Sequence, residues 1–279
     1  MTKISQRSEV LARLAAVIEA EPRPSGSFGP ALVAGLRTQV AFDHLVAFAY
    51  RGQARPVLVA ETFTPAESHV YVTLYQEGPY LLDPFFHAAV EGRQGFWRMR
   101  ELAPDRFFAS EYYRSYYTQT ALAEEVGFFV SLDAETSVVV SLMRRVDHGA
   151  FGAAEIRLLR DLAPVVLALC GRQWRALAET GWRVPASRRA IGAKSGSRPF
   201  ADNLDLPLTP KEFQIVELVL RGLSTAAIAR HLGMAAGTVK VHRRNVYRKL
   251  GIGSQAGLFA KFTEAMSGTA PFPLLANSR

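Results

Sequence analysis

Cysteine, long apolar runs and an apolar amino-terminal segment are missing or nearly missing from this sequence. Its single cysteine, Cys170, cannot form an internal disulfide, and beside the apolar run 163–169 we interpret it as a small buried side chain rather than a redox group. Runs such as 162–170 are too short to span a bilayer, and the polar residues 1–7 contain no secretory signal. We therefore expect a cytoplasmic protein with no membrane partner.

The sequence also lacks the residue patterns of common catalytic and cofactor sites. It contains no nucleophile elbow, phosphate-binding loop or dinucleotide fingerprint. His44, His69, His87 and His148 are scattered and have no Cys or His partner at the spacing of metal ligands. We predict that the protein is not an enzyme and has no catalytic residue, metal or cofactor. Catalysis in the amino-terminal part is the least favoured alternative.

Basic residues accumulate in the final third of the chain. Residues 1–182 contain 18 Lys and Arg against 20 Asp and Glu, residues 183–199 contain five basic residues and no acid, and residues 200–279 contain ten against five. The net charge of +8 therefore comes entirely from the carboxy-terminal third. This asymmetry indicates a polyanionic partner for that part of the chain.

Residues 183–206 separate two regions that differ in pattern. The segment is rich in Pro, Gly, Ser and Arg and has little apolar periodicity, which is typical of a linker. We expect a regulatory domain at 1–182, a basic flexible linker at 183–206, a second domain at 207–266 and a carboxy-terminal tail at 267–279.

Periodicity predicts mixed helices and strands in the first domain. Helices are expected at 8–20, 30–40 and 153–180, helical segments over 67–122, and strands at 44–50, 56–63, 126–132 and 137–143. The turns 51–53 and 133–135 would close two hairpins. This order predicts an α+β domain with an antiparallel sheet flanked by helices. It does not supply the βα repeat of a phosphoacceptor domain, so phosphorelay control is not expected.

Start and stop signals of four short helices follow one another in residues 208–265. The run Thr209-Pro210-Lys211-Glu212 is a capping box with Pro at the first helical position. Serines at 224 and 254 are placed to cap the second and fourth helices, and glycines at 222, 233 and 251 to end the first three. The second domain is therefore predicted to be an all-α helix-turn-helix unit.

Helix phase divides the predicted third helix, 237–250, into two faces. Val239, Val246 and Leu250 form an apolar arc, with His242 at its edge as a core histidine. Lys240, Arg244 and Arg248 recur every four residues on the other side, where cations attract phosphates and reach guanine edges. A charged row alone is usually a solvated helix face. After a capped helix and a glycine turn, the row favours a DNA-recognition helix.

These motifs resemble the LuxR/GerE family of DNA-binding domains. The resemblance covers about 55 residues without a gap and includes LTP-x-E, GLS…IA-x-x-L and TVKVH-x-x-N-x-Y-x-KL. It implies a homodimer joined through the fourth helix that binds double-stranded operator DNA, with RNA polymerase as a further candidate partner. It also implies base reading by Lys240, Val241 and Arg244. The implied phosphate contacts are Thr225, Thr238, Arg243, Tyr247 and Arg248.

The chain departs from that family before the third helix. Ala235-Ala236-Gly237 stands where the family usually has Ser or Thr followed by Pro. Loss of a capping hydroxyl costs on the order of 1 kcal/mol. We therefore expect the recognition helix to become fully ordered only when it is bound to DNA.

A second resemblance links the first domain to the quorum-sensing subgroup of the same family. It rests on Tyr80-Leu81-Leu82-Asp83-Pro84, Trp97 and Gly127, whereas His69, Val70, Tyr71 and Tyr75 replace the usual upstream aromatic pair. In that subgroup the aspartate binds the amide of an acyl-homoserine lactone and the tryptophan holds its ring carbonyl. The candidate ligand residues are Tyr71, Tyr80, Asp83, Trp97, Phe108 and Tyr112.

Aromatic residues are unusually dense between positions 96 and 117. Core packing or a dimer face explains such density most simply, but an aromatic box could also hold an amine cation balanced by Asp83, Glu111 or Glu125. The favoured hypothesis is a regulator that binds a small-molecule effector in its first domain and thereby controls promoter binding. The alternative is a first domain controlled by a protein partner.

Overall fold

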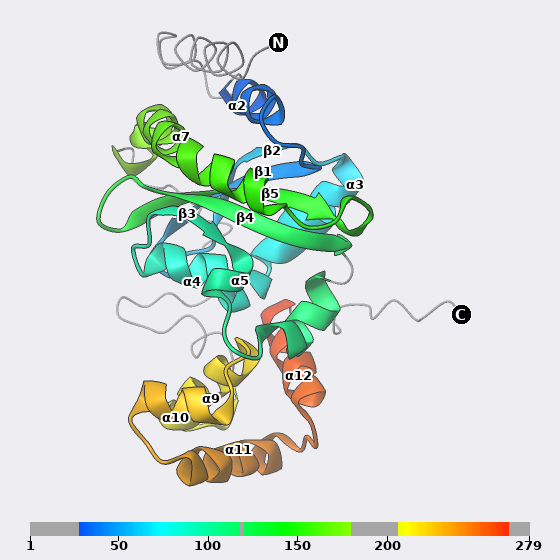
Figure 1. The fold of residues 1–279 in the computed structure, drawn as a ribbon. Helices are drawn as coiled ribbons and strands as arrows, with labels where there is room; N and C mark the ends of the chain where they lie inside the picture. Colours follow the sequence, from blue (N-terminus) through cyan, green and yellow to red (C-terminus); the bar gives the residue numbers. More distant parts are fainter. Residues whose placement is uncertain (1–27, 118–119, 180–205, 268–279) are drawn as a thin grey trace.

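The structure, a computed structural model, describes residues 28–117, 120–179 and 206–267. An α–β–α sandwich forms the first part, and four helices form the second (Figure 1). The fold class expected from the sequence is confirmed. The predicted helix 8–20, linker 183–206 and tail lie outside the described residues, apart from residue 206 of the linker and residue 267 of the tail.

Five antiparallel strands form the sheet in the order β2-β1-β5-β4-β3. Their bounds are β1 His44–Arg51, β2 Val57–Glu61, β3 Gly95–Arg98, β4 Leu122–Ser131 and β5 Thr136–Arg145. Both predicted hairpins are confirmed, since β1 pairs with β2 and β4 pairs with β5. Gly52, with a φ of 50°, makes the first turn possible.

Helical segments dominate 67–122 as expected, but the stretch also contains β3, which was not predicted from the sequence and which pairs with β4 as an edge strand. The remaining elements of this stretch are α3 Pro65–Ser68, η1 His69–Leu74, η2 Pro79–Leu82, α4 Pro84–Val90, α5 Met99–Leu102, η3 Phe107–Ala109 and η4 Tyr113–Tyr117. Prolines begin α3, η2 and α4, so the chain changes direction repeatedly instead of forming long helices.

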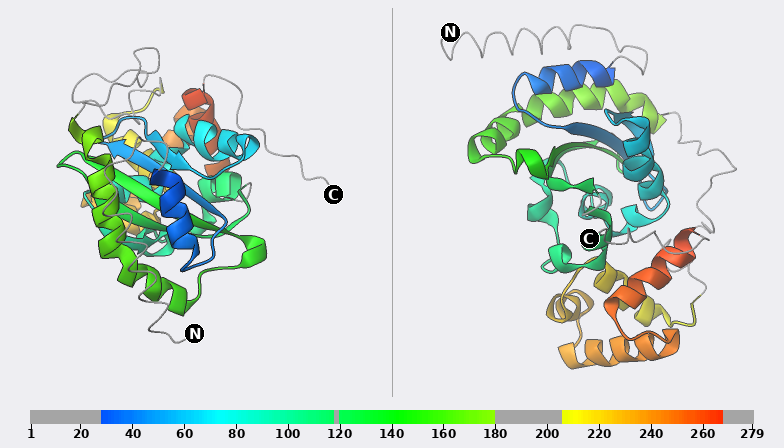
Figure 2. Two further views of the ribbon diagram at one scale, coloured as in Figure 1. Left: turned by 90° about the horizontal axis from the view of Figure 1, so that it is seen from above. Right: turned by 90° about the vertical axis from the view of Figure 1, so that its right-hand side faces the viewer.

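Alternation along the strands gives the sheet two buried faces. On β4, Val126 and Phe128 pack under α2 (Phe28–Arg37) and α7 (Ala153–Glu179), whereas Phe129 faces the opposite layer. Figure 2 shows α2 and α7 on one side of the sheet and the four-helix part beyond the other side. The long helix α7 appears where periodicity predicted it.

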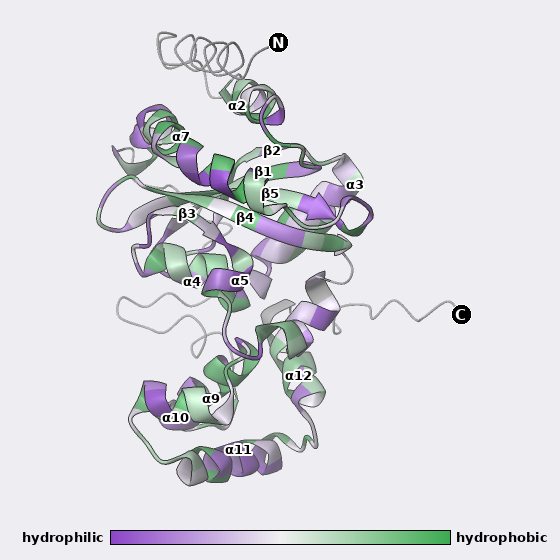
Figure 3. Ribbon diagram, viewed as in Figure 1, coloured by the Kyte–Doolittle hydropathy of each residue, from purple (hydrophilic) through white to green (hydrophobic). Residues whose placement is uncertain are grey.

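The carboxy-terminal part contains α9 Pro210–Leu220, α10 Thr225–Leu232, α11 Ala236–Leu250 and α12 Gln255–Ser267. Each predicted signal is present: Thr209 forms the capping box, and Ser224 caps α10. Gly233 and Gly251 end α10 and α11 in the left-handed conformation. Figure 3 shows that α11 is the most hydrophilic of these helices. Within the three described ranges, no helix is long and apolar enough to cross a bilayer.

Gly127 lies under a ring of α4 in the middle of β4. A Cβ there would stand 2.9 Å from the Phe85 ring, 3.0 Å from the Phe129 ring and 3.2 Å from Val139. Real Cβ atoms rarely come so close, so the buried rings must shift to admit a methyl group.

We expect Gly127→Ala to lower the free energy of unfolding by about 1–3 kcal/mol because it overpacks the core. Gly35→Ala is the matched control: a Cβ in that α2 position meets nothing within 4 Å, and helix propensity predicts a gain of about 0.5–1 kcal/mol. Urea denaturation of both variants measures the difference. Equal stability of the two variants would contradict this account of β4.

Candidate functional site

The recognition helix α11 is anchored by one face and free on the other. Val239 and Val246 are buried in the helical core, as the helix phase predicted. Lys240, Val241 and Arg244 are all exposed, with Val241 at 45%. Figures 1 and 2 show α11 on the side of the helical part that faces away from the sheet. The predicted base-reading residues therefore share an open surface.

Three of the predicted phosphate-contact residues form a connected group, Thr225–Arg243–Tyr247. The Arg243 guanidinium donates to Thr225 Oγ1 at 3.2 Å and to Tyr247 Oη at 3.3 Å. This places the start of α10 beside the middle of α11. Thr238 and Arg248 are exposed on α11 itself.

As the sequence predicts, α11 has no side-chain cap at its amino terminus. Ala235 occupies the cap position and its side chain accepts no hydrogen bond. The other end of the helix is fixed by Lys249, whose Nζ lies 2.7 Å from the Glu212 carboxylate. Burial alone would raise the pKa of Glu212, but the hydrogen bonds from Lys249 and Thr209 outweigh it and lower that pKa. The recognition helix is therefore held by contacts with both α9 and α10.

A small cavity lies in the first domain between β1, β4, β5 and the layer of short helices. It offers about 20 Å³ to a water-sized sphere, which is room for roughly one water molecule. Aromatic rings and two carboxyl groups make most of its wall. The lining residues are Val46, Phe48, Tyr50, Tyr71, Tyr75, Asp83, Tyr117, Leu122, Glu125, Ser141 and Met143.

The two carboxyl groups in the cavity wall receive hydrogen bonds from neutral donors. Tyr75 Oη donates to Asp83 Oδ2 at 2.6 Å, and the Phe85 backbone N–H donates to Asp83 Oδ1 at 2.8 Å. Tyr117 Oη donates to Glu125 Oε2 at 2.9 Å. The lining contains no Lys, Arg or His. Asp83 also caps α4, so the Asp-Pro pair has a structural role beside any role in binding.

Burial makes both carboxyl groups weak acids. It raises the pKa of Glu125 to about 8, and the charge of Asp83 adds to the rise. Burial also raises the pKa of Asp83 to about 6, although the hydrogen bonds from Tyr75 and Phe85 act in the opposite direction. One proton on this pair near neutral pH avoids two adjacent buried charges.

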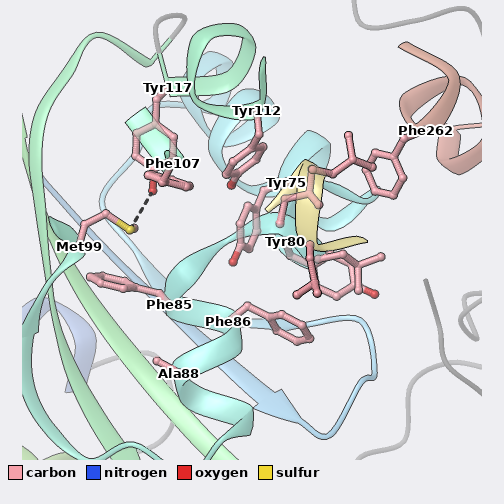
Figure 4. Close-up of a cluster of buried hydrophobic side chains, with 14 of the residues drawn as sticks. Tyr75, Tyr80, Phe85, Phe86, Ala88, Met99, Phe107, Tyr112, Tyr117 and Phe262 are labelled. Atoms are coloured by element: carbon pink, nitrogen blue, oxygen red, sulfur yellow. Dashed lines mark hydrogen bonds between the residues drawn. The ribbon is translucent and has the colours of Figure 1, made fainter. Parts of the chain in front are cut away.

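The structure brings together only part of the predicted ligand set. Tyr71 and Asp83 line the cavity, whereas Tyr80 and Tyr112 are buried in the surrounding aromatic cluster (Figure 4). Trp97 and Phe108 lie outside the lining. The Trp97 indole N–H donates to Gln94 O at 2.8 Å, and Phe108 is 50% exposed.

Several residues of the cavity wall were not in the predicted set: Tyr50, Tyr75 and Tyr117, with Glu125 named only as a nearby acid. Alternation from Phe129 back along β4 puts Glu125 on the inner face, which is a signal that the sequence offers. No comparable signal places Tyr50, Tyr75 and Tyr117 around one space, because they come from separate elements. Glu111 does not line the cavity.

We expect the Glu125 carboxyl group to make stability fall as pH rises. The folded state holds this proton up to about pH 8, whereas an unfolded chain releases it near pH 4.3. Between these values the free energy of unfolding should decrease by up to ~1.4 kcal/mol per pH unit. The stability of wild type minus that of Glu125→Gln, from urea denaturation at pH 5 to 8, isolates this effect from buried histidines. A difference independent of pH would refute the assignment.

Known proteins match this chain in both parts. The GerE model, which describes bacterial regulatory proteins of the luxR family, matches residues 206–261. A candidate HTH-type transcriptional regulator in the exeN 3'region of Aeromonas salmonicida is 32% identical over 200 residues, which are 68% of this chain and 96% of that protein. The transcriptional regulatory protein MctR of Rhizobium johnstonii is 46% identical over 52 residues, which are 19% of this chain and 24% of that protein.

Solved structures also match. The VqsR LBD domain from Pseudomonas aeruginosa is 26% identical, with a TM-score of 0.48, over 60% of this chain and 94% of that chain. Escherichia coli SdiA is 16% identical, with a TM-score of 0.40, over 94% of this chain and 97% of that chain. The matched residues 206–261 contain the capped α9, the α10 turn and the exposed α11, and the Aeromonas relative is matched over almost its whole length. The chain belongs to the LuxR family of DNA-binding transcriptional regulators.

Proposed function

We propose that this LuxR-family regulator binds a small molecule in the cavity of its first domain and that occupancy of the cavity sets promoter affinity. The observation that supports this proposal is the pair of buried carboxyl groups in an aromatic wall without a basic side chain. Burying two such groups opposes folding unless their hydrogen-bonding capacity is used. A ligand that donates hydrogen bonds to these carboxyl groups would offset the free-energy cost of burying them.

The effector should carry hydrogen-bond donors or a positive charge. Asp83 and Glu125 accept hydrogen bonds, and the rings of Tyr50, Tyr71 and Tyr75 offer apolar and cation–π contacts. The amide N–H of an acyl-homoserine lactone and an amine cation both satisfy this requirement. Because the free cavity is water-sized, the surrounding aromatic side chains must move to admit either ligand.

Control by a protein partner is the weaker alternative. It depended on exposed aromatic residues between positions 96 and 117, but most of the described ones are core residues. Phe96, Phe107, Tyr112 and Tyr117 are buried, and Phe108 is exposed. This burial favours an internal effector site over a docking surface.

We propose that residues 1–182 form the regulatory domain, 183–206 the linker and 207–266 the DNA-binding domain, acting as a homodimer in the cytoplasm, where the operator DNA lies. Two recognition helices would read half-sites about one helical turn apart. The exposed side of α12, which includes Lys261 and Glu264, is the proposed dimer surface. RNA polymerase is a further proposed partner.

Removing either long side chain of the proposed base-reading set should strongly reduce sequence-specific binding. Lys240 and Arg244 are exposed on α11, so Lys240→Ala or Arg244→Ala leaves the core intact. Each lost base contact should cost about 1–3 kcal/mol of discrimination. Footprinting on an operator obtained by selection from random duplexes measures the loss.

Arg248→Ala is the matched control for these two variants. It removes one cation from the same helix, and we expect weaker binding to all sequences with a log–log salt slope smaller by about 0.9. Normal operator protection by Lys240→Ala or Arg244→Ala would show that another surface reads the bases.

A small molecule should copurify with the full-length protein. We expect mass spectrometry of the denatured protein to detect it in wild type and to show depletion of roughly tenfold or more in Asp83→Asn, because the ligand loses an ionised acceptor. Asp133→Asn, in the β4–β5 turn, is the control. Absence of any released compound, together with DNA affinity unaffected by cell extract, would contradict effector control.

A further inference from the structure

A short loop of the first domain docks on the turn that joins α9 to α10. The Arg106 backbone N–H donates to Gly222 O at 2.9 Å, and the Ser224 backbone N–H donates to Asp105 Oδ1 at 2.9 Å. Gly222 has a φ of 90°, and a Cβ there would lie 2.7 Å from Phe107 Cα. Only glycine permits this approach of the two backbones. We call residues 105–107 the docking loop.

The docking loop places the Asp105 carboxylate at the edge of the proposed DNA surface. Asp105 holds the residue that immediately precedes Thr225, and Thr225 belongs to the connected group with Arg243 and Tyr247. Burial alone would raise the pKa of Asp105, but hydrogen bonds from Ser224 and the charge of Arg230 lower it, so the group is ionised at neutral pH. A DNA phosphate approaching this group would meet a negative charge.

The side-chain cap of α10 comes from the helix-turn-helix itself and not from Asp105. Ser224 caps α10 with its own side chain, since Oγ accepts the Ala227 backbone N–H at 3.1 Å. The Asp105 carboxylate accepts from a different donor, the Ser224 backbone N–H, which the Ser224 side chain does not satisfy. This argues for a role between the domains instead of within one.

Side-chain contacts join the docking loop to the cavity. The Phe107 ring is fully buried and lies 5.9 Å from the ring centroids of both Tyr112 and Tyr117. Tyr117 in turn lines the cavity and donates to Glu125. Figure 4 shows Phe107, Tyr112 and Tyr117 side by side above Phe85. A ligand that displaces Tyr117 must also disturb the packing of Phe107.

We propose that the docking loop is an autoinhibitory latch. Docked on Gly222 and Ser224, it holds the helix-turn-helix in a form with reduced DNA affinity, and cavity occupancy shifts docking through Tyr117 and Phe107. The latch rests on the proposed function, because it presumes that Thr225, Arg243 and Tyr247 face phosphates. DNA binding and docking then oppose each other, so each weakens the other by the same factor.

Removing the Asp105 charge should tighten DNA binding. We expect full-length Asp105→Asn to bind a mixed-sequence 30-bp duplex in low salt on the order of tenfold more tightly than wild type, by fluorescence anisotropy. Asp147→Asn is the matched control: it makes the same charge change in the first domain, where Asp147 pairs with Arg145. Unchanged or weaker binding by Asp105→Asn would overturn the latch, since docking would then be neutral or supportive.

Hydrogen exchange of the unmodified protein provides a second measurement. Saturation with the same duplex should accelerate amide exchange in residues 104–109 at least severalfold while slowing it in α11. Unaltered protection of 104–109 on DNA would show that docking persists in the complex and would also overturn the latch. A wild type that binds no duplex at all would instead refute the proposed function, so the two failures are distinguishable.

Discussion

Burial of both faces of the sheet is the constraint on which the first domain depends. Each buried polar side chain on β4 and β5 must find a hydrogen-bond partner, because water does not reach it. Arg144 does so through Glu155 and the Ala41 carbonyl, and Glu124 does so through Arg98 and the Phe151 N–H. Glu125 has only neutral donors, and it faces a cavity. That contrast is why we propose the cavity, and not the other buried charges, as the site of an added ligand.

The sequence predicts the local features of this protein better than the non-local ones. The two hairpins, α7 and the caps at Thr209 and Ser224 follow from periodicity and capping residues within a few positions. The four-residue strand β3 was missed because its strand state comes from pairing with β4, about thirty residues away along the chain. The cavity was only half anticipated for the same reason: Tyr71 and Asp83 were named, but Tyr75 and Tyr117 meet them through tertiary packing.

The helix-turn-helix shows how tertiary contacts replace a missing local signal. No side chain caps α11 at Ala235, yet Val239, Val246 and the Lys249–Glu212 pair fix the helix against its neighbours. The Glu212 carboxylate also completes the capping box of α9. The positions of both helices therefore depend on one buried acid. The exposed side of α11 can vary without disturbing this support.

The size of the interdomain contact decides whether a ligand could release it. Docking of residues 105–107 includes one backbone hydrogen bond and the hydrogen bonds from Ser224 to the Asp105 carboxylate, each worth about 0.5–3 kcal/mol net. Ligands typically shift allosteric equilibria by about 1–3 kcal/mol. Phe107 keeps its aromatic neighbours in the first domain when the loop leaves Gly222, so its burial adds little to this sum. Apolar side chains of both parts also share one buried cluster, so these hydrogen bonds are one part of the docking free energy that an effector would oppose.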